Sequence, residues 1–181
     1  SLYLTPRKEV CSLAGNNTSV KAVTVSANGK GALSGSLDDT LKGWKLTTGK
    51  ELFTLEGHIN SVKAVAVTAD GKRAISGSRD YTLKVWDLTT RKEVFTLEGH
   101  SNSVNAVAVS ADGKGAISGS WDDTLKVWNL TTGKELFTLE GHSNSVKAVA
   151  VTADGKRAIY GSRDNTLKVW DLTTRKELFT L

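Results

Sequence analysis

The sequence has few residues that could cross-link the chain or break a strand or helix: it contains one cysteine and one proline in 181 residues. It also contains no methionine. Cys11 has no partner for an internal disulfide bond and leaves no zinc knuckle. No apolar run approaches the roughly 18 residues of a membrane-spanning helix, and no basic start with an apolar stretch indicates a signal peptide. We therefore expect a cytoplasmic protein without a membrane, and the missing methionine indicates a processed chain or a fragment.

The excess of positive over negative charge is small. Lysine and arginine number 24 against 19 acidic residues, a net charge of +5. Both signs are mixed along the chain and there is no basic arm, which argues against nucleic acid as a partner and still permits an acidic one. The 39% of hydrophobic residues is low for a helical core but suits short, half-buried strands.

What the sequence does contain is one unit written four times. Gly57, Gly99 and Gly141, each followed by histidine, lie 42 residues apart. The copies occupy 15–56, 57–98, 99–140 and 141–181, after a lead-in at 1–14. Repeats of this length indicate stacked supersecondary units.

Each unit divides into four short runs with strand character. Asp70-Gly71 and its equivalents separate the first two runs, and this dipeptide favours a type I′ hairpin turn, with positive φ at both central residues. Alternation places Leu83 and Val85 on one face and Lys84 and Trp86 on the other. We predict an all-β chain of four-stranded antiparallel meanders, whose two apolar faces require neighbours to stack on each side.

The repeated Gly-His, the Ser-Gly-Ser-x-Asp sequence, and Trp-Asp at Trp86-Asp87 and Trp170-Asp171 resemble the WD40 repeat. The resemblance extends from Gly15 to Leu181 and implies a β-propeller with four blades per chain. Residues 1–14 match the end of a unit, so the resemblance makes them the outer strand of a preceding blade, either a latch or a scar of excision.

A second period lies inside the first. Units two and four differ at only four of 41 positions, whereas units one and three share Gly-Lys-Gly and Thr-Thr-Gly-Lys sequences. The amplified module is therefore a pair of blades, duplicated recently or constructed deliberately.

Four residue types that recur in the units could be taken for catalytic groups. His58, Ser76 and Asp80 could be parts of a hydrolase triad, but an active site has no reason to be copied into every unit. The resemblance implies instead a buried hydrogen-bonded tetrad of His, Ser, Asp and Trp, so we expect no catalysis, metal or cofactor. Unit one departs from it with Asn16 for histidine. In unit four Tyr160 replaces serine, and its ring must swing out or displace neighbours. The expected tetrad members are Ser34, Asp38, Trp44, His58, Ser76, Asp80, Trp86, His100, Ser118, Asp122, Trp128, His142, Asp164 and Trp170.

The resemblance also places three positions per blade on the narrow side of the disc, where WD40 proteins commonly contact partners. This set is rich in cations and has no acid, which favours an acidic protein, peptide or phosphopeptide as partner. Two alternatives stay open: amplification copied the cations without a ligand, or equivalent inter-blade pockets bind a ligand in a lectin-like way. Besides one serine per blade, the expected partner-binding residues are Lys21, Leu37, Lys63, Arg79, Asn105, Trp121, Lys147 and Arg163.

Four such blades should not close into a ring, because WD40 blades pack at angles suited to about seven. An open arc would expose an apolar sheet face at each end. We therefore expect a scaffold or interaction module that forms a homodimer, an eight-bladed ring closed between blades 4 and 1.

Overall fold

The computed structural model describes residues 12–16 and 18–181. The described residues form sixteen strands and no helix. Most of the outer strand predicted at 1–14 lies outside the described residues, and residues 12–16 have no regular secondary structure. The strands are β1 (Val20–Val25), β2 (Gly31–Ser36), β3 (Leu41–Lys45), β4 (Lys50–Leu55), β5 (Val62–Val67), β6 (Arg73–Ser78), β7 (Leu83–Asp87), β8 (Lys92–Leu97), β9 (Val104–Val109), β10 (Gly115–Ser120), β11 (Leu125–Asn129), β12 (Lys134–Leu139), β13 (Val146–Val151), β14 (Arg157–Ser162), β15 (Leu167–Asp171) and β16 (Lys176–Thr180).

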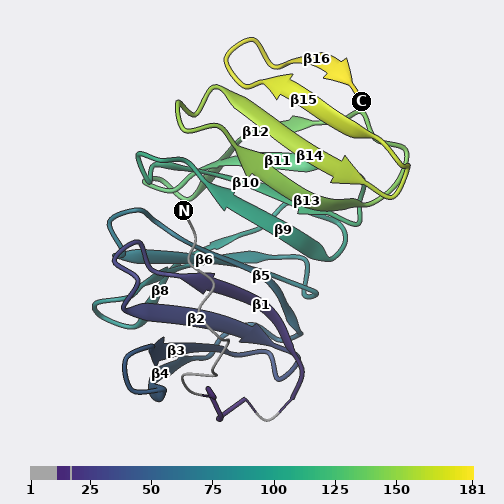
Figure 1. Ribbon diagram of the computed structural model, residues 1–181. Helices are drawn as coiled ribbons and strands as arrows, with labels where there is room; N and C mark the ends of the chain where they lie inside the picture. Colours follow the sequence, from purple (N-terminus) through teal and green to yellow (C-terminus); the bar gives the residue numbers. More distant parts are fainter. Residues whose placement is uncertain (1–11, 17) are drawn as a thin grey trace, which may run out of the picture.

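Each group of four consecutive strands forms one antiparallel sheet, which confirms the predicted fold class. We call these sheets blades 1 to 4. They follow one another in chain order as a stacked arc, from blade 1 at the bottom of Figure 1 to blade 4 at the top. The first strand of each blade contacts the first strand of the next, so β1, β5, β9 and β13 line the inner side of the arc.

The hairpins at Asp70-Gly71 and its equivalents correct the expected turn type. Gly71 has a φ of 69°, but Asp70 is not among the residues with positive φ. The Gly71 amide donates to the Thr68 carbonyl at 2.8 Å, and the Thr68 amide bonds the Arg73 carbonyl at 3.0 Å. The loop is longer than a type I′ turn because the Asp70 carboxylate accepts hydrogen bonds from the Lys72 amide and the Thr68 hydroxyl, which favours a conventional φ at Asp70.

Apolar side chains fill the three junctions between blades. We call the face of a blade toward the preceding blade its upstream face, and the opposite one its downstream face. At the junction of blades 2 and 3, Ile75, Leu83 and Leu97 of the downstream face pack against Val104 and Trp128 of the upstream face. Equivalent clusters fill the other two junctions, so each sheet hides its two apolar faces between its neighbours.

Candidate functional site

Blades 2 and 3 bring the predicted tetrad residues together with nearly identical geometry. In blade 2, His58 Nδ1 lies 2.7 Å from Asp80 Oδ2, and His58 Nε2 lies 2.7 Å from Ser76 Oγ. Trp86 Nε1 donates to the same Ser76 hydroxyl at 2.8 Å. The set in blade 3 has distances of 2.7, 2.7 and 2.8 Å, with its members His100, Ser118, Asp122 and Trp128.

The donors and acceptors of this chain follow from the carboxylate at its end. Burial raises the pKa of Asp80, but hydrogen bonds from His58 and Thr82 lower it more, and the pKa ends well below its usual range. An ionised Asp80 accepts the Nδ1 proton of His58, so Nε2 accepts the hydroxyl proton of Ser76. Ser76 Oγ then accepts the Trp86 indole proton, and every polar atom of the chain has a partner.

The same geometry limits what these groups can do. The side chains of His58 and Ser76 are buried, and Ser76 is fully enclosed, so the hydroxyl meets no substrate in this conformation. The described residues also contain no group of three or more His, Cys, Asp or Glu side chains placed to hold a metal ion. The arrangement joins the loop before the inner strand to the second and third strands, and a satisfied buried network fixes that geometry.

Blade 1 holds a shortened version of the network. Trp44 Nε1 donates to Ser34 Oγ at 2.8 Å, and Asn16 Nδ2 donates to the same oxygen at 3.3 Å. The side-chain oxygen of Asn16, Oδ1, is buried without a hydrogen-bond partner. Asp38, the predicted fourth member, accepts hydrogen bonds from the amide and hydroxyl of Thr40 instead.

Blade 4 retains only one link of the network. His142 Nδ1 lies 2.6 Å from Asp164 Oδ2, but Tyr160 fills the serine position and its ring lies against the His142 ring, with centroids 4.8 Å apart. The Tyr160 ring does not swing out, because only 1% of the residue is exposed. It displaces Trp170, which is half-buried where Trp86 and Trp128 are buried. His142 Nε2, the Tyr160 hydroxyl and Trp170 Nε1 are left without hydrogen-bond partners.

The predicted partner-binding residues lie at one edge of the blades, opposite the Asp-Gly turns. In each blade one lies near the start of the inner strand, and the next follows the second strand. A backbone hydrogen bond joins the two segments, as from the Arg79 amide to the Ser61 carbonyl at 2.9 Å, with equivalents in every blade. We call this set the narrow-face patch: Lys21, Leu37, Lys63, Arg79, Asn105, Trp121, Lys147 and Arg163.

The cations of the narrow-face patch form two sets whose members repel one another, one in blades 1 and 2 and one in blade 4. Burial lowers the pKa of Lys63, and the charges of Lys21 and Arg79 lower it further. Lys147 Nζ lies 4.5 Å above the Trp121 ring, and burial together with Arg163 lowers the pKa of Lys147. None of the ion pairs formed among residues 12–16 and 18–181 includes a cation of this patch.

Comparison with known proteins identifies this architecture. The family model described as "WD domain, G-beta repeat" matches residues 7–45, 49–87, 91–129 and 133–171, most of the chain. The chain belongs to the WD40 family. Each matched repeat from 49 onward begins near the outer strand of one blade and ends with the third strand of the next, so repeats and blades are offset by one strand. Members of this family are generally non-catalytic propellers that bind protein partners.

A solved structure described as "Structure of U3-55K" is similar to the chain, with a TM-score of 0.86 and 25% sequence identity. The similarity covers 92% of this chain and 53% of that one, so this WD40 chain spans about half the length of the structure it matches. No curated protein matches the chain. The described residues contain no helix that is long and apolar enough to cross a membrane, since all their regular elements are strands.

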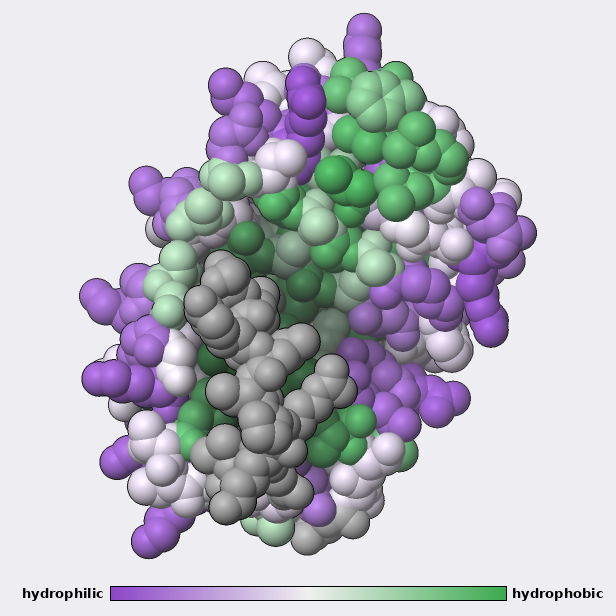
Figure 2. Space-filling view, viewed as in Figure 1, coloured by the Kyte–Doolittle hydropathy of each residue, from purple (hydrophilic) through white to green (hydrophobic). Residues whose placement is uncertain are grey.

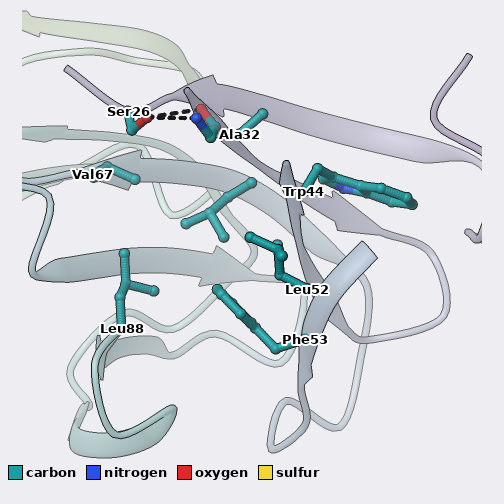
Figure 3. A pocket seen from close by; sticks show the side chains of 10 residues that line it. Ser26, Ala32, Trp44, Leu52, Phe53, Val67 and Leu88 are labelled. Atoms are coloured by element: carbon teal, nitrogen blue, oxygen red, sulfur yellow. Dashed lines mark hydrogen bonds between the residues drawn. The ribbon is translucent and has the colours of Figure 1, made fainter. Parts of the chain in front are cut away.

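Two of the WD40 junctions contain apolar cavities. The cavity between blades 1 and 2 measures about 130 Å³, and Figure 3 shows Phe53, Val67 and Leu88 around it. Gly43 lines the cavity where the other blades have valine, and the Phe53 ring occupies the space that a Cβ at Gly43 would take. A cavity of about 210 Å³ lies between blades 3 and 4. The walls of these two cavities are mainly apolar.

The structure also shows a repeated network at the outer edge of the blades that was not predicted. In blade 3, Lys126 Nζ bonds Glu135 at 2.9 Å and Thr138 at 2.8 Å. Every other WD40 blade repeats it with the same residue types. These residues lie nine and twelve positions apart, so only the pairing of β11 with β12 reveals that they meet.

Proposed function

We propose that this WD40 chain is a protein-interaction module whose narrow-face patch binds an acidic peptide segment. The observation that carries the proposal is a group of five cations, Lys21, Lys63, Arg79, Lys147 and Arg163, with no ion pair among the described residues. Burial lowers the pKa of Lys63 most, and an anionic partner would offset the repulsion by Lys21 and Arg79 that lowers it further.

The acids that directly follow the two arginines of the patch in the sequence are already engaged. Asp80 directly follows Arg79, but its two carboxylate oxygens bond His58 and Thr82. Asp164 follows Arg163 and bonds His142 and Thr166. The tetrads therefore have a structural role in the proposal: they hold each turn in place and keep its carboxylate away from the cations.

Trp121 provides an anchor of a different kind. It is 40% exposed, and its ring carries the ammonium group of Lys147 on one side. Exposed tryptophan and arginine are enriched among the residues that contribute most to binding. A peptide with carboxylates or a phosphate beside an apolar residue fits this combination.

The proposal is tested by the fluorescence anisotropy of a labelled peptide rich in aspartate and glutamate. We expect Lys63→Glu with Arg79→Glu to weaken binding by at least about tenfold, equivalent to about 1.4 kcal/mol. The matched control is Lys72→Glu with Lys114→Glu, which makes the same change in net charge at the Asp-Gly turns, and it should weaken binding by less than about threefold. Equal losses in both variants would mean that net charge alone attracts the peptide and would contradict the proposal.

A further inference from the structure

Each end of the arc exposes a blade face of the kind that packs against a neighbouring blade at the three internal junctions. Leu83 of blade 2 is 0% exposed, whereas its counterpart Leu167 of blade 4 is 38% exposed. Phe179 and Leu181 continue this open downstream face with 51% and 73% exposure. Figure 2 shows hydrophobic residues gathered over this end of the molecule, where Figure 1 places β14 to β16.

The inner strand of blade 1 exposes the complementary valines on its upstream face, whereas Ala32 and Trp44 on the second and third strands are buried. Val62, Val104 and Val146 begin the inner strands of blades 2 to 4 and are fully buried. The equivalent Val20 is 48% exposed, and Val23 beside it is 68% exposed. The residue type that fills each junction is therefore present on blade 1, where Val20 and Val23 are exposed.

A glycine shows how closely the two halves fit. In blades 1 to 3, a Cβ at the glycine of the second strand would lie 2.5 to 2.6 Å from the valine of the next blade. These pairs are Gly35 with Val62, Gly77 with Val104, and Gly119 with Val146. Each glycine thus leaves a slot that the valine of the next blade fills. Gly161 is the same slot in blade 4, and a Cβ there would meet nothing within 4 Å.

The residue types at these two ends match those that fill the internal junctions. Blade 4 carries on its downstream face the residue types of blade 2, and blade 1 carries on its upstream face those of blade 3. Contact between blade 4 and blade 1 would therefore reproduce the chemistry of the junction between blades 2 and 3. The compared residues are Ile159, Leu167, Val169, Phe179 and Leu181 with Ile75, Leu83, Val85, Phe95 and Leu97, and Val20, Val23, Val25, Ala32 and Trp44 with Val104, Val107, Val109, Ala116 and Trp128.

We propose that a second copy of this 181-residue chain occupies both open faces, with Val20 of each copy seated on Gly161 of the other. Two such contacts form a closed ring of eight blades with two-fold symmetry, within the four to eight blades that propellers adopt. The lead-in at 1–14 is a weaker candidate occupant, because its sequence matches one outer strand only. It has no equivalents of Gly161, Ile159 and Leu167 on the second and third strands.

The test is the native mass of the 181-residue chain by light scattering, measured over a dilution series together with the circular dichroism spectrum. We expect a mass of twice 19.3 kDa that falls toward the monomer on dilution. Gly161→Val fills the open slot, and its Cβ meets nothing of its own chain within 4 Å. It should therefore leave the spectrum unchanged and weaken the dimer by at least about tenfold. Val20→Asp should do the same from the other face.

The matched control is Ile59→Asp, because Ile59 is 85% exposed and lies on neither open face. It should remain a dimer. Three results would overturn the proposal: a monomer at every concentration, a mass that grows without a limit, or an unchanged dimer in Gly161→Val. A chain that dimerises only after residues 1–14 are removed would also overturn it, by showing that the lead-in occupies the face of blade 1.

Discussion

Restoring serine at position 160 should stabilise the protein, although it removes a large buried side chain. In blade 4, His142 Nε2, the Tyr160 hydroxyl and Trp170 Nε1 are buried without partners. Each unsatisfied polar atom costs about 1–3 kcal/mol. A serine hydroxyl would donate to His142 and accept from Trp170, as Ser118 does between His100 and Trp128 in blade 3.

The loss of the Tyr160 ring opposes this gain. Burying an aromatic side chain contributes about 1.5–3 kcal/mol, but Trp170 can return to the buried position of Trp128 and recover much of that area. The substitution removes one unpaired atom, the Tyr160 hydroxyl, and gives partners to His142 Nε2 and Trp170 Nε1. This gain outweighs the lost ring, and we expect Tyr160→Ser to raise the free energy of unfolding by about 1–3 kcal/mol. At about 2–4 °C per kcal/mol, the melting temperature should rise by several degrees.

The assay is chemical and thermal unfolding of both proteins at one protein concentration. The reverse change, Ser118→Tyr, should lower stability by a similar amount because it breaks a complete tetrad. A Tyr160→Ser protein that is less stable than the parent would refute the reasoning, since it would mean that the tyrosine ring contributes more than the network it interrupts.

Three further outcomes follow from single residues. Tyr81 has a φ of 74°, where the other blades place Asp or Asn, so Tyr81→Asn should stabilise by about 0.5–1 kcal/mol in urea unfolding; a loss of stability would contradict a strained backbone there. Asn16→His should supply the missing link between Ser34 and Asp38 and raise the melting temperature, and no rise would mean that blade 1 does not accommodate the ring. Hydrogen bonds hold the pKa of Asp80 below its ordinary 3.8, so the stability they contribute is present above pH 4 and is lost as pH falls through the lower folded pKa. An Asp80→Asn protein should therefore lose less stability in acid, as measured by unfolding between pH 2 and 6. An equal loss of stability in both proteins would assign the acid sensitivity to other groups.

The fold could be predicted from the sequence because the same constraint is repeated. Gly57, Gly99 and Gly141 set the period, and the alternation around Trp86 separates two apolar faces that only stacked sheets can bury. The tetrad geometry in blades 2 and 3 also follows once the family resemblance is recognised. The fold and the tetrad geometry can be predicted without knowledge of side-chain packing, because every copy of the unit repeats the same pattern.

The details that could not be predicted depend on space and pairing rather than pattern. Tyr160 stays buried because its junction yields at Trp170, which no local sequence reveals. The turn at Asp70 departs from the expected type because a side-chain hydrogen bond outweighs the dipeptide preference. Lys126 and Glu135 meet only through the register of two strands, in which Glu135 lies opposite Trp128.

The central claim is that the narrow-face patch receives an acidic partner. It is tested most directly by NMR, through the chemical-shift changes of backbone amides when an aspartate-rich peptide is added. The account predicts that the largest changes cluster at Lys63, Arg79, Trp121, Lys147 and Arg163. Changes that cluster instead at the Asp-Gly turns, or spread evenly over all four blades, would contradict it.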